Sequence, residues 1–114
     1  MTRIRTGRLF SEEHPDLYGK WILGHFVKDS DFNTKGFEVK FQTDVKGMKR
    51  DPKPVIDSNT ITLAVLVDGH VKMNFGDKDR FLKERGDYIW WSPDTPDLFE
   101  YLEDSLVLTV RWSS

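Results

Sequence analysis

Short apolar segments, separated by turn-forming pairs at intervals of about ten residues, fill the C-terminal half of the chain. The turns are marked by Asp68-Gly69, Gly76-Asp77, Gly86-Asp87 and the prolines at 93 and 96. Residues 60–67 are β-branched or apolar nearly throughout, and residues 71–75 alternate apolar and polar side chains, so both are typical of strands. No segment shows the periodicity of an amphipathic helix. The pattern predicts an antiparallel all-β sandwich or barrel with little helix.

Further strands are predicted on both sides of this pair. They are residues 20–27, 37–41, 80–82, 87–91, 98–101 and 105–112. The Asp68-Gly69 pair between residues 60–67 and 71–75 is typical of a β-hairpin. Residues 46–59 are polar and contain two prolines, which predicts a long loop. We therefore expect residues 1–114 to form one domain, with residues 1–19 as an irregular N-terminal arm.

The composition excludes several functional classes. The chain has no cysteine, which excludes disulfides, thiolate catalysis and cysteine–zinc sites. Its net charge of −2 argues against a nucleic-acid-binding protein. No apolar run approaches the roughly 20 residues that span a bilayer, and no apolar segment follows the basic residues 1–8 as a signal peptide would require. We expect a cytoplasmic protein that binds neither nucleic acid nor membranes.

Two glycine-containing segments are similar to the motifs of the cupin superfamily. Residues 66–71 resemble the strand–Gly–strand that closes the first cupin motif, and residues 86–97 resemble the second, a Gly-Asp strand that ends in a proline-containing turn. Residues 106–112 look like the last barrel strand, so the resemblance covers roughly residues 36–112. It implies a cupin-type jelly-roll barrel, the double-stranded β-helix, as in small stand-alone bacterial cupin-like proteins.

The resemblance does not extend to the metal ligands of cupins. The first motif normally supplies two histidines and a glutamate, and these positions correspond to Lys53, Val55 and Thr62. The histidine of the second motif corresponds to Asp97. A transition metal needs three or four convergent ligands, and none of the three histidines lies at a ligand spacing from another. We predict degenerate metal-binding motifs, with no metal and no other cofactor.

The candidate ligand site consists of polar and aromatic residues on the predicted barrel strands. Its residues are Lys40, Trp91 and Arg111, with Glu38 and Thr62 as polar neighbours. The cupin pattern implies that Trp91 faces the barrel interior and that its neighbour Trp90 faces outward. Inside the barrel, Trp91 either stacks on a flat ligand or simply fills the core, and core filling is the favoured alternative.

The orientation of the charged candidates is open. The alternation in residues 37–41 favours Phe37, Val39 and Phe41 facing the core, with Glu38 and Lys40 in water. By the same reasoning Leu108 and Val110 share a buried face, although the opposite side with Arg111 is then the barrel interior if both faces are covered. His25 is predicted to be partly buried, on a strand face with Trp21 and Leu23.

Three functions follow from these alternatives. The favoured hypothesis is a non-catalytic cupin-like protein that binds a small polar or carboxylate ligand in its barrel. The second is a metal-independent sugar or acid isomerase with Glu38 or His25 as general base. The third is an interaction protein that acts through a homodimer surface, because outward aromatic side chains such as Trp90 and Trp112 are typical of contacts.

Overall fold

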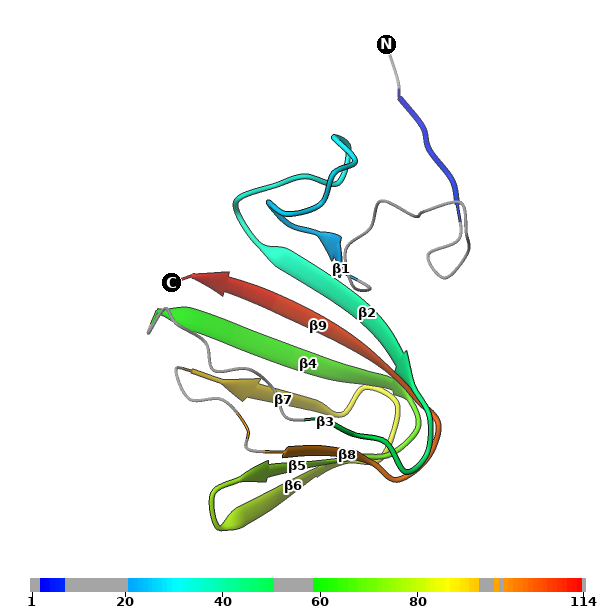
Figure 1. Ribbon diagram of the computed structural model, residues 1–114, viewed down its shortest axis with the longest axis vertical. Helices are drawn as coiled ribbons and strands as arrows, with labels where there is room; N and C mark the ends of the chain where they lie inside the picture. Colours follow the sequence, from blue (N-terminus) through cyan, green and yellow to red (C-terminus); the bar gives the residue numbers. More distant parts are fainter. Residues whose placement is uncertain (1–2, 8–20, 51–58, 93–95, 97, 114) are drawn as a thin grey trace.

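The computed structural model describes residues 3–7, 21–50, 59–92, 96 and 98–113, and these residues form nine strands in two sheets (Figure 1). Sheet A has the order β1 (Trp21–Leu23), β2 (Glu38–Asp44), β9 (Ser105–Ser113), β4 (Thr60–Asp68) and β7 (Tyr88–Trp91). Sheet B has the order β3 (Lys49–Arg50), β8 (Leu98–Tyr101), β5 (Val71–Phe75) and β6 (Lys78–Leu82). All pairings between these strands are antiparallel, and no helix occurs in the described part of the chain. The all-β prediction is confirmed.

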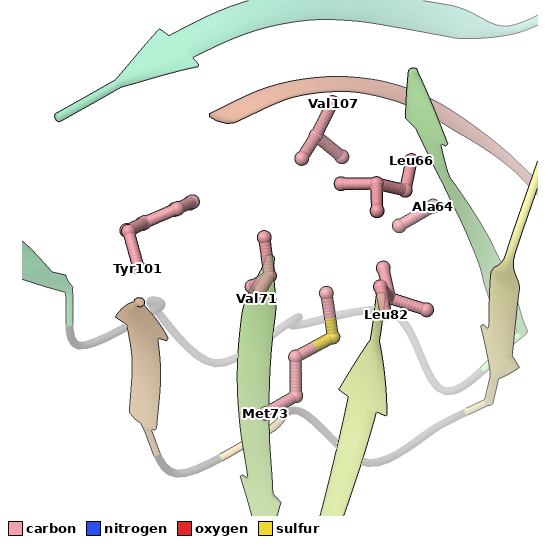
Figure 2. Packing of buried hydrophobic residues seen from close by; sticks show 7 residues of the cluster. All are labelled: Ala64, Leu66, Val71, Met73, Leu82, Tyr101 and Val107. Carbon is pink, nitrogen blue, oxygen red and sulfur yellow. The ribbon is translucent and has the colours of Figure 1, made fainter. Parts of the chain in front are cut away.

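The inner faces of the two sheets enclose one hydrophobic core (Figure 2). Sheet A contributes Ala64, Leu66 and Val107, and sheet B contributes Val71, Met73, Leu82 and Tyr101. Along β4 every second side chain from Thr60 to Leu66 is buried, whereas those between them are less so. This alternation defines the inner face of sheet A, which also carries the candidate site.

The predicted strand over residues 20–27 is wrong beyond Leu23. At Gly24 the chain turns away from sheet A, and the Gly24 amide donates to the Phe32 carbonyl at 3.2 Å. Gly24 has φ +155°, a backbone conformation that residues with a side chain rarely adopt, which favours glycine at this turn. The Asn33 side chain closes the loop by donating to the backbone carbonyls of His25 and Val27. The apolar residues between 20 and 27 therefore predicted a strand that is longer than the observed one, which ends where the loop begins at Gly24.

The predicted hairpin at Asp68-Gly69 is also wrong. Strand β4 lies in sheet A and β5 in sheet B, so this turn is a corner that carries the chain from one sheet to the other. Gly69 has φ +110°, and a Cβ atom there would lie 2.6 Å from the Asp104 carbonyl oxygen and still closer to the Ser105 hydroxyl. The hairpin occurs one turn later, where Phe75 pairs with Lys78 across Gly76-Asp77.

Candidate functional site

One row of sheet A brings together four of the five predicted ligand residues. Glu38 on β2 lies opposite Arg111 on β9, Arg111 lies opposite Thr62 on β4, and Thr62 lies opposite Trp91 on β7. Residues directly opposite each other in a sheet share a face. Ala64, two residues from Thr62, belongs to the core, so the whole row lies on the inner face. We call these four residues the inner row.

The structure reverses the orientation that the alternation of residues 37–41 favoured. Glu38 and Lys40 lie on the inner face, whereas Phe37 remains 44% exposed. The next inward residues of β2 are Gln42 and Asp44, and both are buried. Val39 and Phe41 instead belong to the outer face. The apolar residues of β2 therefore mark the outside of the barrel rather than its core.

Arg111 faces inward for the same reason. Val107, four residues before Arg111 on β9, is in the core. Because side chains alternate between the two faces of a strand, Thr109 and Arg111 lie on the same face as Val107. Leu108 and Val110, which were expected to share the buried face, lie on the outer face of the sheet. Both are only partly buried. Arg111 therefore enters the barrel interior as a half-buried cation.

The charged end of the inner row is built around Trp21. The Arg111 guanidinium donates from Nε to Glu38 Oε2 at 2.6 Å and pairs with the same oxygen through Nη2. Its Cζ atom lies 4.6 Å from the centre of the Trp21 ring, and Lys40 Nζ lies 5.6 Å from that ring. Two cations thus contact the same aromatic ring, and one of them also pairs with a carboxylate. We call Arg111, Lys40, Glu38 and Trp21 the cationic cluster.

Sequence reasoning missed Trp21 as a site residue. Its pairing with Lys40 places it beside the site, but the register of β1 shifts between Trp21 and Leu23. That irregularity breaks simple alternation, so the face predicted for Trp21 with Leu23 and His25 did not place it beside Lys40. The one available signal was the predicted strand face that Trp21 shares with the candidate base His25.

His25 lies outside the strand in which it was predicted. Its side chain is 62% exposed, and Nδ1 lies 3.7 Å from Glu38 Oε1 at the edge of the cationic cluster. The predicted partly buried strand histidine is therefore wrong for His25. The His70 side chain, by contrast, has a buried Nε2 atom.

The aromatic end of the inner row is Trp91. Trp90 is 54% exposed and Trp91 packs against the core, as the cupin pattern implied. The Trp91 ring makes edge contacts with Phe75 at 5.9 Å and Phe99 at 6.3 Å between ring centres. Its indole Nε1 is buried, and no acceptor for it occurs among the described residues. A buried donor without an acceptor is unfavourable by about 1–3 kcal/mol.

A second polar centre lies at the opposite end of β2. Asp44 Oδ1 accepts hydrogen bonds from Arg50 Nε at 2.8 Å, Arg50 Nη2 at 2.6 Å and Gln42 Nε2 at 3.2 Å. Burial, followed by the charge of Asp44 and a hydrogen bond to it, raises the pKa of the Tyr101 phenol well above its usual value. We call Asp44, Arg50, Gln42 and Tyr101 the buried network.

A cavity of about 470 Å³ opens beside the buried network. Its lining includes Asp44, Arg50, Asp68 and Asp104. Three carboxylates against one guanidinium give this cavity a negative charge, which disfavours an anionic ligand. None of the five predicted ligand residues lines it.

The described residues do not fit the metal that cupin barrels commonly hold. Among them, no three histidine, aspartate or glutamate side chains gather closely enough to hold an ion. Thr62, at the position matched to the glutamate ligand, lies opposite Arg111, whose positive charge repels a metal cation. Lys53, Val55 and Asp97 lie outside the described residues.

No family model and no curated protein matches the sequence. Solved structures do match the fold. The cupin_2 domain of an XRE family transcriptional regulator from Enterobacter cloacae is 14% identical with a TM-score of 0.61, and the match covers 69% of this chain and 83% of that one. A cupin superfamily protein from Desulfitobacterium hafniense is 11% identical with a TM-score of 0.61, covering 71% of each chain.

The chain has the cupin fold. An HTH_3 family transcriptional regulator from Vibrio cholerae is also similar, at 18% identity and a TM-score of 0.60, but only 44% of its length is covered. At these identities the likeness concerns the cupin fold alone. No helix in the described residues is long and apolar enough to cross a membrane.

Proposed function

We propose that this cupin-fold protein binds a small organic carboxylate at the inner row without the help of a metal. The observation that carries the proposal is the register that aligns Glu38, Arg111, Thr62 and Trp91 on one inward-facing row. A charge turned toward a barrel interior needs a partner, because burying an unpaired charge is costly.

The charge of the cationic cluster selects an anion. Arg111 and Lys40 bring two cationic side chains to this end of the row, and Arg111 keeps 32% of its side chain exposed. A guanidinium is planar and presents paired donors that match the two oxygens of a carboxylate. The Trp21 ring stabilises the cations by cation–π contact and fixes their position.

The other end of the row selects the body of the ligand. Trp91, Phe75 and Phe99 form an aromatic wall, and Thr62 is buried beside it. The buried Trp91 N–H has no acceptor among the described residues, and an oxygen of the ligand would supply one. These features favour a carboxylate with a flat or apolar body over an inorganic anion.

The isomerase hypothesis has less support. Glu38 Oε2 already accepts a hydrogen bond from Arg111 Nε and pairs with its Nη2, so this carboxylate is held by the arginine. His25 is largely exposed and lies outside the inner row.

The test is a thermal-shift and calorimetric titration with a panel of aromatic and aliphatic carboxylates. We expect the melting temperature to rise with ligand concentration, since a ligand at 100 times its Kd stabilises the folded state by about 2.7 kcal/mol. Arg111→Gln should weaken binding by at least about tenfold, because a hydrogen bond to a charged group contributes about 1.5–3 kcal/mol.

Two further variants make the result decisive. Glu38→Gln combined with Arg111→Gln removes both charges, so no lone carboxylate remains in the barrel, and this double variant should fold but bind no better than Arg111→Gln. Arg80→Gln removes an exposed arginine of β6 and should bind normally. Unchanged affinity in Arg111→Gln, or no response of the wild type to any carboxylate, would overturn the proposal.

A further inference from the structure

The chain between β1 and β2 forms a compact loop at the same end of the molecule as the N-terminal segment 3–7 (Figure 1). We call residues 24–34 the β1–β2 loop. Its two ends are joined, because the Thr34 amide donates to the Gly24 carbonyl at 3.2 Å. Compact loops whose ends lie close together are packed by their own side chains and are frequently functional.

One side of the β1–β2 loop lies against the cationic cluster. The Phe26 ring makes an edge contact with the Trp21 ring at 5.5 Å between centres, and His25 packs edge-on against Phe26 at 5.1 Å. His25 Nδ1 lies 3.7 Å from Glu38 Oε1, which is longer than a hydrogen bond. The loop thus touches two members of the cluster, and its polar contact with Glu38 is weak.

Two arginines of the N-terminal segment hold another side of the β1–β2 loop. Arg5 binds both oxygens of Asp29, from Nη1 at 3.0 Å and from Nη2 at 2.6 Å, and Nη1 also donates to Asp31 Oδ2 at 2.8 Å. Arg3 Nη2 donates to Asp31 Oδ1 at 2.7 Å. The Arg5 Cζ atom lies 4.8 Å from the centre of the Phe32 ring. Hydrogen bonds from Arg5, and then from Arg3, lower the pKa of the Asp31 carboxyl, so this carboxylate stays charged at neutral pH.

We propose that the β1–β2 loop is a lid over the cationic cluster and that Arg3 and Arg5 are the latch that holds it closed. The inference rests on the carboxylate site proposed above and adds control of access to that site. A bidentate, charge-assisted pair with Asp29 is much stronger than the contact of His25 with Glu38, so the latch decides the position of the loop. The Arg3 and Arg5 side chains are 82% and 43% exposed, so dissolved salt screens the latch. Access to the cationic cluster should therefore increase with ionic strength.

A distance measurement without any ligand tests the latch. The chain has no cysteine, so Lys28→Cys on the loop and Glu84→Cys before β7, both at exposed positions, place two spin labels at defined sites. Pulsed electron resonance should give one main distance in this labelled parent. Arg5→Gln should increase the population at other distances at least about threefold, because it removes two exposed ion pairs. Asp31→Asn should act in the same direction although it changes the net charge in the opposite sense, and 1 M NaCl should act likewise. Arg80→Gln, which removes an exposed arginine of β6, should have no effect.

Stopped-flow fluorescence with benzoate tests the lid. Arg5→Gln should raise the association and dissociation rate constants together, by about three- to tenfold, because the ligand enters and leaves only while the loop is open. Arg111→Gln, which damages the site itself, should mainly raise the dissociation rate constant. Unchanged distances in Arg5→Gln would overturn the proposal, and so would benzoate rate constants that this variant leaves as they are. If no carboxylate binds the wild type, the proposed function fails, and the distances still decide whether Arg5 holds the loop.

Discussion

The two ends of strand β2 each carry a carboxylate that binds an arginine, but the two pairs differ in burial and in the number of other partners. The Asp44 side chain is 2% exposed and accepts three hydrogen bonds on one oxygen. The Glu38 side chain is 19% exposed, and its arginine lies against an aromatic ring. The same chemical pair is thus a closed structural element at one end and an open cluster at the other.

This difference explains why only one end is a plausible anion site. At the buried network the arginine is neutralised by Asp44, and Asp68 and Asp104 add negative charge to the adjoining cavity. At the cationic cluster Lys40 adds positive charge. The Glu38–Arg111 pair keeps contact with solvent, whereas the Asp44 carboxylate is closed off from it.

The largest expected effect comes from the buried end. Asp44→Asn should lower the free energy of unfolding by about 2–3 kcal/mol, because hydrogen bonds from charged Arg50 are lost in a buried site. Glu38→Gln should lower it by less than about 1 kcal/mol, since both partners of that pair retain contact with water. Urea unfolding of both variants measures the two values.

The contrast between the two ends is contradicted if Glu38→Gln lowers the free energy of unfolding by as much as Asp44→Asn does, or by more. Carboxylate binding provides the complementary readout. Under conditions in which Asp44→Asn is folded, it should bind carboxylates with wild-type affinity, whereas Arg111→Gln should bind them more weakly.

Sequence patterns predicted the long strands well. Strands β4 and β9 run for nine residues each, and β-branched content over that length is difficult to reconcile with any other element. The predicted strand at residues 98–101 matches β8. Strand β3 was missed inside the predicted loop, because two residues have no local pattern and form a strand only by pairing with Glu100 and Phe99.

The orientation of the site was harder to predict. In residues 38–44 the charged side chains lie on one face of the strand, and Val39 and Phe41 lie on the other. The local sequence does not show which of these two faces the second sheet covers. The answer depends on pairing with β9, more than 60 residues away in sequence. The four inner-row residues were predicted as parts of one ligand site, but only this long-range register shows that they are neighbours.

A smaller effect is expected at alkaline pH. The folded protein raises the pKa of the Tyr101 phenol, so the unfolded chain loses this proton first, near pH 10. The contribution of Tyr101 to stability is therefore complete below that pH and is lost as pH rises, with a limiting slope of about 1.4 kcal/mol per pH unit. Tyr101→Phe should reduce this slope and also lower stability at neutral pH by about 1 kcal/mol.

Tyr88→Phe is the control for this effect, because Tyr88 is 68% exposed. Urea unfolding at pH 8, 9.5 and 10.5 should give the same slope for Tyr88→Phe and the wild type. An equal slope in Tyr101→Phe would show that the buried network does not hold the phenol in its neutral form.

The smallest expected effect is at the cationic cluster. Lys40 lies farther from the Trp21 ring than Arg111 does, at 5.6 Å against 4.6 Å, so its contribution should be mainly that of a nearby charge. Lys40→Met should therefore weaken carboxylate binding by only about two- to fivefold, corresponding to about 0.5–1 kcal/mol. The wild-type affinity should fall as salt is raised, and the variant should show a weaker dependence.

Lys78→Met, which removes an exposed lysine on β6, separates a local effect from one of net charge. The two variants have the same total charge, so a contribution of Lys40 through the whole-protein field would weaken binding equally in both. We expect Lys78→Met to bind like the wild type, because screening at physiological salt limits exposed charges to about 8 Å. Equal losses would mean that Arg111 alone recognises the ligand and that Lys40 only adjusts the overall charge of the open end of β2.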